Sequence, residues 1–148
     1  MNTPWGKSDS KTNIIHGVSW VGTPSHGGLA VTVRAATAIW YPEDGTRQRQ
    51  MLSSKALKLA DRKGSYFFFE EDCLYAIAFY EHPEWKRALE LQIAAANNGT
   101  YVREADAEIK ADMERVIRRW FPAYFAEADA ARLEREIPCD IDRHVEEE

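Results

Sequence analysis

The sequence contains little of what marks a secreted, membrane-bound or disulfide-stabilised protein. Only two of its 148 residues are cysteines, Cys73 and Cys139, and they form neither a CxxC pair nor an evenly spaced set. This pattern excludes a disulfide scaffold and favours free thiols in a reducing cytoplasm. No apolar run approaches the roughly 18 residues of a membrane-spanning helix, and the polar start lacks the apolar segment of a secretion signal. We therefore expect a cytoplasmic protein with no membrane partner.

Established catalytic and ligand-binding motifs are also missing. The chain has no glycine-rich phosphate loop, no HExxH, no GxSxG and no zinc-ligand spacing. We therefore expect no cofactor and no bound metal. His16, His82 and His144 have no partner residue at ligand spacing, so we expect each to be an ordinary surface histidine.

The length and the 45% hydrophobic content indicate one domain of class α+β over residues 1–148. We predict a small antiparallel sheet, made of an N-terminal hairpin (17–23 and 28–33) and an aromatic strand (65–69), that is covered by C-terminal helices. Residues 1–16 read as an irregular arm, 34–41 as helical turns and 55–62 as a short helix capped by Ser53 or Ser54. The later helices are predicted at 70–82, 84–96, 105–120 and 122–136.

These elements divide the chain into a motif-bearing α+β part (3–96), a helical part (100–138) and a frayed tail (139–148). The side chains expected to contribute to the core are Trp20, Phe67, Phe68, Leu74, Ile77, Leu89, Ile93, Val116, Ile117 and Trp120.

Charge is unevenly distributed along the chain. Residues 1–69 hold 9 Lys/Arg and 4 Asp/Glu and residues 70–148 hold 10 and 20, so the two parts carry +5 and −10. A pI near 5.4 argues against direct nucleic-acid binding, for which a basic surface is expected. The acidic helices are either a solvated surface or a surface that docks on a basic protein partner, and Glu104, Glu108 and Asp112 are the predicted binding residues of the second alternative.

The densest polar group between apolar segments is Thr23-Pro-Ser-His-Gly-Gly28. It is either a plain hairpin turn or a functional loop in which Ser25, Gly27 and Gly28 approach a ligand and His26 acts as a base. Glu70-Glu71-Asp72 lie at the start of a predicted helix. Either they stabilise the N-terminus of that helix, or they form a site in which they share a proton, bind a cation or orient His26. Cys73 is either a packing residue or a thiol made reactive by that helix start.

These residues resemble one small domain family of unknown function, found in proteobacterial chromosomes, plasmids and phages. The resemblance rests on Trp5-Gly6, His26-Gly27-Gly28 and Glu70-Glu71-Asp72 and covers roughly residues 3–90. It implies that His26, the two glycines and the three acidic residues form a shared site, although it implies no reaction. It also implies an accessory role on a mobile element.

Two functions follow from these observations. The first is an accessory protein of a phage or mobile element that acts by protein binding, such as an anti-CRISPR-like inhibitor of a nucleic-acid-processing host defence system. The alternative is a small enzyme, a hydrolase or transferase, in which His26 works with Glu70, Glu71 or Asp72. The distance between His26 and the three acidic residues should discriminate between them, and we expect the two motifs to lie close together.

Overall fold

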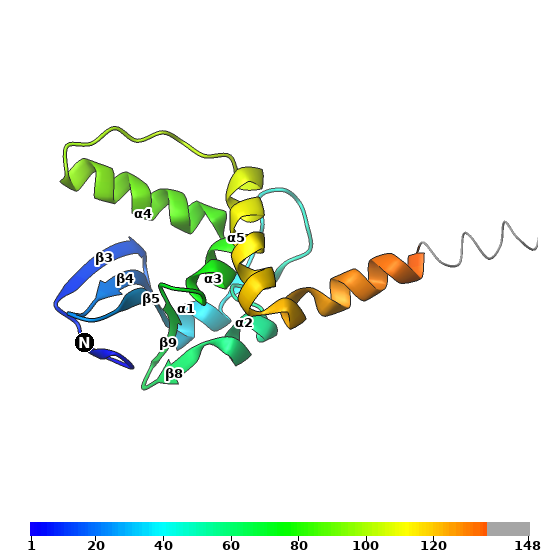
Figure 1. Ribbon diagram of the computed structural model, residues 1–148, viewed down its shortest axis with the longest axis horizontal. Coiled ribbons are helices and arrows are strands. Elements are labelled where there is room, and N and C mark those ends of the chain that lie inside the picture. The colour runs from blue at the N-terminus through cyan, green and yellow to red at the C-terminus, as the bar shows by residue number, and fades with distance from the viewer. Residues whose placement is uncertain (136–148) are drawn as a thin grey trace, which may run out of the picture.

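The computed structural model describes residues 1–135 and contains a five-stranded antiparallel sheet together with a set of helices (Figure 1). The strands lie in the order β3-β4-β5-β9-β8, and their bounds are Ser10–Ile15, Val18–Gly22, Gly27–Thr32, Tyr66–Glu70 and Asp61–Lys63. The predicted α+β class is confirmed, and so are the hairpin and the aromatic strand.

Both edge strands were missed in the sequence. Residues 1–16 are not an irregular arm, because β1 (Asn2–Thr3) pairs with β2 (Gly6–Lys7) and β3 pairs with β4. The helix predicted over 55–62 is α2, Ser54–Leu59, and the chain then forms β8 beside β9. Edge strands expose one side to water and can be mostly polar, so neither β3 nor β8 has an apolar pattern.

The aromatic strand β9 is buried on both faces of the sheet. Phe67 and Phe69 join the main core beneath the helices, whereas Phe68 packs on the other face with Val21 and Ala30. Trp5 covers that second face and meets Phe68 edge-to-face at 5.7 Å between ring centroids. The β1–β2 hairpin therefore covers part of the sheet face that the helices leave open.

The helices differ from prediction mainly where they begin and end. Ser53 caps α2 as expected, since its Oγ accepts a hydrogen bond from the Ala56 amide. The helical turns predicted at 34–41 shorten to α1, Val33–Thr37, because Ile39–Trp40 (β6) pairs with Arg49–Gln50 (β7). The bounds of the later helices are α3 Tyr75–Glu81, α4 Pro83–Ala96 and α5 Asp106–Trp120.

The chain after α5 forms a 3-10 turn, η1 Pro122–Phe125, and residues 126–135 are helical and project away from the rest of the molecule (Figure 1). Residue 136 of the predicted last helix and the predicted tail, 139–148, lie outside the described residues. None of the helices in 1–135 is long and apolar enough to cross a membrane.

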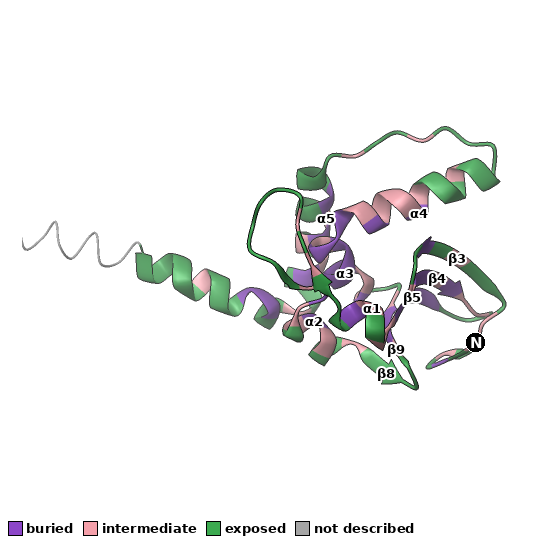
Figure 2. Ribbon diagram, turned by 180° about the vertical axis from the view of Figure 1, so that it is seen from behind, coloured by how far each residue is buried: buried purple, intermediate pink, exposed green. Residues whose placement is uncertain are grey.

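Most of the predicted core is confirmed, including Leu74, Ile77 and Ile117, while Trp20 and Val116 are partly buried. Two predictions were wrong: Ile93 is 46% exposed and Trp120 is 56% exposed. The outer half of α4 is mostly exposed and extends beyond the core (Figure 2). Trp120 is the last residue of α5 and lies on its exposed side. Helical periodicity finds the apolar face of a helix, but it does not show where the neighbouring layer stops.

Candidate functional site

His26 lies in the tight turn that joins β4 to β5. The Thr23 amide donates to the His26 carbonyl at 2.7 Å, and the His26 amide donates to Thr23 Oγ1 at 3.0 Å. These bonds hold the backbone of the turn, while the imidazole of His26 remains exposed to solvent. The turn therefore presents His26 at one end of the sheet.

The three acidic residues follow directly on the strand beside this turn. Glu70 is the last residue of β9 and pairs with Gly28, and the Glu71 amide donates to the Gly27 carbonyl at 3.0 Å. The predicted helix start at Glu70 was wrong: α3 begins at Tyr75, its first turn holds no acidic residue, and no side chain caps it. Stabilisation of a helix N-terminus therefore does not account for the position of these three carboxylates.

The two motifs meet, as expected from the sequence. One ligand atom from each of His26, Glu70 and Asp72 can be chosen so that all three lie within 4.8 Å of one another. This is the one group of three such side chains that residues 1–135 contain. An imidazole nitrogen and two carboxylate oxygens at this spacing could exchange a proton or hold a divalent cation. The catalytic roles predicted for these residues and for Glu71 stay predictions.

Gly27 and Gly28 are buried within β5, where they permit close approach of other groups. A Cβ atom on Gly28 would lie 2.3 Å from the Phe69 carbonyl oxygen and 2.7 Å from the Trp5 ring. A Cβ on Gly27 would lie 3.2 Å from Glu71 Oε2. Packing therefore accounts for both glycines, while Ser25 is exposed in the turn and its predicted binding role stays a prediction.

Cys73 has the properties of a packing residue rather than a reactive thiol. It lies against the main core, and burial together with the nearby Glu70 carboxylate raises the pKa of its thiol. A raised thiol pKa lowers the fraction of nucleophilic thiolate at neutral pH. Of the two alternatives for Cys73, the structure supports packing.

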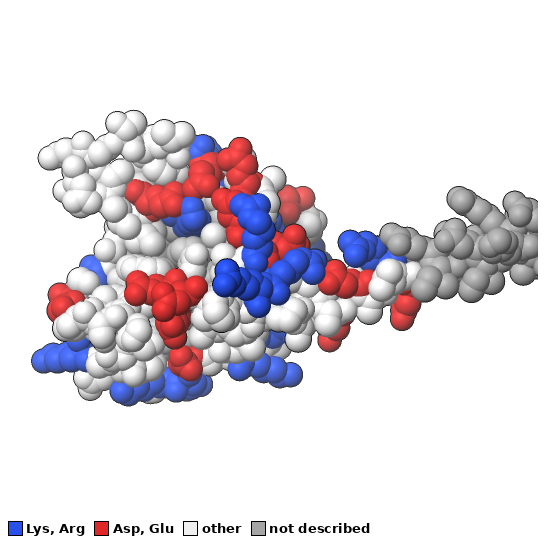
Figure 3. Space-filling view, viewed as in Figure 1, with Lys and Arg blue, Asp and Glu red and all other residues white. Residues whose placement is uncertain are grey.

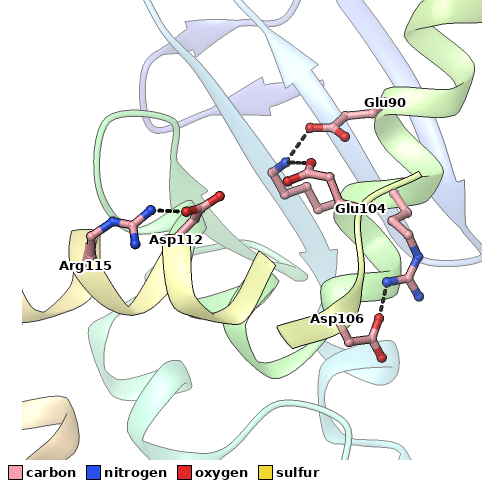
Figure 4. Close-up of polar contacts among 7 residues, drawn as sticks. Glu90, Glu104, Asp106, Asp112 and Arg115 are labelled. Atoms are coloured by element: carbon pink, nitrogen blue, oxygen red, sulfur yellow. Dashed lines mark hydrogen bonds and ion pairs between the residues drawn. The ribbon is translucent and has the colours of Figure 1, made fainter. Parts of the chain in front are cut away.

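The acidic residues of the later helices are largely neutralised by neighbouring cations (Figure 4). Lys86 lies 2.5 Å from Glu90 and 2.7 Å from Glu104, and Asp112 pairs with Arg115 on the same helix. Burial alone would lower the pKa of Lys86, but its hydrogen bonds to these two glutamates raise it, and the bond from Lys86 lowers the pKa of Glu104.

A second acidic surface lies at the other motif and has no such cations. We call Glu70, Glu71 and Asp72 the acidic turn; within residues 1–135 none of the three forms an ion pair. Figure 3 shows one group of acidic side chains over the end of β9 and, separately, others along α4 and α5, with further acidic side chains elsewhere on this face. The acidic turn is therefore a run of three consecutive carboxylates without a paired cation in residues 1–135.

A buried polar network that was not predicted from the sequence lies at the end of α3. The carboxylate of Glu81 accepts hydrogen bonds from the Ser53 amide (2.8 Å), the Ser53 hydroxyl (2.5 Å) and the Tyr124 hydroxyl (2.5 Å). Burial and the neighbouring Glu81 raise the pKa of Tyr124. This network ties α2, α3 and η1 together.

His82, predicted to be a surface histidine, is fully buried. Its ring stacks on Trp85, and its two nitrogens lie 2.7 Å from Glu84 Oε1 and 2.5 Å from the Met51 carbonyl oxygen. Glu81 and His82 are adjacent polar residues at the end of an apolar helix, just before Pro83, which is the signal that could have suggested a buried pair.

Residues 1–147 match the family model described as Domain of unknown function (DUF7007). No curated protein and no solved structure matches the chain. The match extends well beyond residues 3–90, the part covered by the three short motifs, and it includes the later helices. The motifs that carry the resemblance are those that the fold brings together at one end of the sheet. The chain therefore belongs to the DUF7007 family.

Proposed function

We propose that the protein is a binding module that docks on a basic surface of a protein partner, and that the acidic turn is its main contact. The observation that carries this proposal is that Glu70, Glu71 and Asp72 project from one turn with no cation of the chain's described part paired to them. Unpaired carboxylates on an open surface attract Lys- and Arg-rich surfaces and repel phosphates.

Charge compensation favours the acidic turn over the later helices as the proposed contact. The helical acids Glu104, Glu108 and Asp112 were the first candidates, but two of them already pair with Lys86 and Arg115. A paired carboxylate contributes less to the field that steers a partner, because its charge is partly cancelled nearby. The helical acids are therefore a secondary contact or a solvated surface.

The open shape of the site supports docking of a macromolecule over binding of a small molecule in a concave pocket. His26, Glu71 and Asp72 are exposed, and none of them lines the cavity beside Arg87 and Arg103 or the cavity beside Val18 and Met51. Small-molecule sites are usually concave and bury most of their ligand. An open acidic corner instead suits contact with another macromolecule.

The partner class that fits best is a nucleic-acid-processing complex, since such complexes expose basic surfaces before nucleic acid binds. The resemblance to domains of plasmids and phages supports an accessory role, in the cytoplasm, as an anti-CRISPR-like inhibitor of a host defence system. In such a role the acidic turn would occupy a surface that otherwise holds nucleic acid.

Two triple variants with equal charge change test the location of the contact. One neutralises the acidic turn by Glu70→Gln, Glu71→Gln and Asp72→Asn, and the control neutralises the helical acids by Glu104→Gln, Glu108→Gln and Asp112→Asn. Each is expressed in cells with an active CRISPR system, and the efficiency of transformation by a targeted plasmid is measured. We expect the native chain to raise the efficiency, the acidic-turn variant to lose at least about tenfold of that effect, and the control to keep most of it.

If neither the native chain nor the control raises the transformation efficiency, the inhibitor role is contradicted. Equal protection by both variants would show that the acidic turn is not the contact. Thermal unfolding of each purified variant establishes that its fold is intact.

The second candidate function is a small enzyme, favoured by the position of the His26 imidazole beside Glu70 and Asp72. A histidine and a carboxylate at this spacing can act as a general acid and base in a hydrolase or transferase. His26→Ala separates the two functions: it would abolish an activity that depends on proton transfer, but it removes no negative charge from the docking surface. Loss of protection in both His26→Ala and the acidic-turn variant would favour the enzyme, whereas loss in the acidic-turn variant alone would favour docking.

A further inference from the structure

A cavity of about 420 Å³ lies at the opposite end of β4 and β5 from His26. Most of its wall is apolar and comes from Ile15, Val18, Ala35, Ala38 and Met51. These residues belong to the end of β3, the start of β4, α1 with its C-cap residue Ala38, and the segment that follows β7. The volume falls within the range of known small-molecule sites, roughly 300–1,000 Å³.

The polar part of the lining is cationic or can donate hydrogen bonds. His16, Thr32 and Arg34 complete the wall. Arg34 is exposed and forms no ion pair with any carboxylate of residues 1–135. Thr32 Oγ1 accepts a hydrogen bond from the Ala35 amide, which leaves its hydroxyl hydrogen free to donate to a ligand. No acidic residue lines the cavity.

Hydrogen bonds to the main chain hold the apolar walls in place. The Met51 amide donates to the Ala38 carbonyl at 2.8 Å, and the Met51 carbonyl lies 2.5 Å from Nε2 of the buried His82. On the other side, the Thr32 amide donates to the Gly17 carbonyl at 2.9 Å. A cavity with such walls exists before a ligand binds, so binding does not require the backbone to reorganise.

We propose that this cavity binds a small amphipathic organic acid. The apolar body of the ligand would lie among Val18, Ala38 and Met51, and its carboxylate would face Arg34 and His16. An arginine with no carboxylate partner forms paired hydrogen bonds with a carboxylate, and the apolar walls favour an aliphatic chain over a purely polar anion. This site is separate from the acidic turn and does not depend on the docking proposal.

Binding is tested by titrating the isotopically labelled full chain with three probes and following the backbone amide signals by NMR. Decanoate has both the chain and the charge, decanol has only the chain, and acetate has only the charge. We expect decanoate to shift the amides of Thr32, Ala35, Ala38 and Met51 in a saturable manner, with at least about tenfold tighter binding than either other probe. No saturable shift with decanoate, or equal affinity for decanol, would overturn the proposal.

Variants locate the site. Arg34→Gln should weaken decanoate binding about tenfold, because the main partner of the carboxylate is lost. Arg47→Gln is the matched control: it removes the same charge from an exposed arginine that does not line the cavity, and it should change the affinity less than twofold. Ala38→Leu should block the cavity and abolish binding. Equal affinities of Arg34→Gln and Arg47→Gln, or unchanged binding in Ala38→Leu, would contradict the assignment.

Discussion

The ring of Trp5 lies against Gly28, so close that a Cβ atom at position 28 would be 2.7 Å from it. The same Gly28 pairs with Glu70 across β5 and β9. One glycine thus joins the W-G, H-G-G and E-E-D motifs, which are far apart in the sequence. The fold brings all three to one end of the sheet, where His26 and the acidic turn are exposed.

Gly28→Ala should be strongly destabilising, because its Cβ would meet the Phe69 carbonyl oxygen at 2.3 Å as well as Trp5. We expect a loss of about 3 kcal/mol or more in the free energy of unfolding, measured in urea. Gly99→Ala is the control: its Cβ would have only ordinary contacts, the nearest at 3.6 Å. A loss in Gly28→Ala no larger than in the control would show that the three motifs do not meet as described.

Ile117→Ala should leave a cavity beneath α5, because Ile117 is fully buried between this helix and its neighbours. The expected loss of unfolding free energy is about 2–5 kcal/mol. On the same helix Trp120 is 56% exposed, so Trp120→Ala should cost clearly less despite the larger side chain removed. The reverse order would mean that the buried face of α5 is wrongly assigned.

Tyr124→Phe should remove one of the three hydrogen bonds to the buried carboxylate of Glu81. We expect a loss of about 1–3 kcal/mol in the free energy of unfolding, since the variant removes a donor from a carboxyl group that is buried from water. Tyr41→Phe removes the same hydroxyl from a tyrosine that is 71% exposed, and it should be neutral. Equal stability of the two variants in a urea titration would argue against the network.

The ion pair between Glu104 and Lys86 should make stability depend on pH. The pKa of Glu104 is lowered in the folded chain. The ion pair therefore stabilises the fold fully above about pH 4.5, and this stabilisation is lost as the pH falls through the lowered pKa. At neutral pH Glu104→Gln should cost about 0.5 kcal/mol, and the difference from the native chain should vanish in acid. Glu108→Gln is the control, because Glu108 forms no ion pair in residues 1–135, and its stability relative to the native chain should not depend on pH. A loss of stability in Glu104→Gln that stays the same at neutral and acid pH would contradict the prediction.

Several parts of the fold could be predicted from the sequence because local signals were strong. Turn residues separate two apolar strands at 24–28, the aromatic run marks β9, and Pro83 with an apolar face marks α4. In α5 the apolar spacing predicted one face made of Ile109, Met113, Val116, Ile117 and Trp120, of which Ile109, Met113 and Ile117 are buried while Trp120 is exposed. Such features depend on a few neighbouring residues, so they can be read directly from the chain.

Three features could not be predicted from the sequence because tertiary contacts decide them: the edge strands, the limit of the core and the buried polar groups. Ser10–Ile15 and Asp61–Lys63 become strands only because β4 and β9 offer free edges to pair with. Glu81 and His82 can be buried because Ser53, Tyr124 and Met51 supply hydrogen-bonding partners from distant segments.

The candidate site shows the same division. From the sequence alone the residue types were evident: a histidine between turn residues, two glycines and three consecutive carboxylates. The distances between these residues came from the tertiary structure, because β5–β9 pairing sets Glu70 beside the His26 turn. The tertiary structure also showed which acids are paired, because Lys86 and Arg115 neutralise acids of the later helices. Side-chain chemistry is a property of each residue, whereas proximity and charge compensation arise from strand register and helix packing.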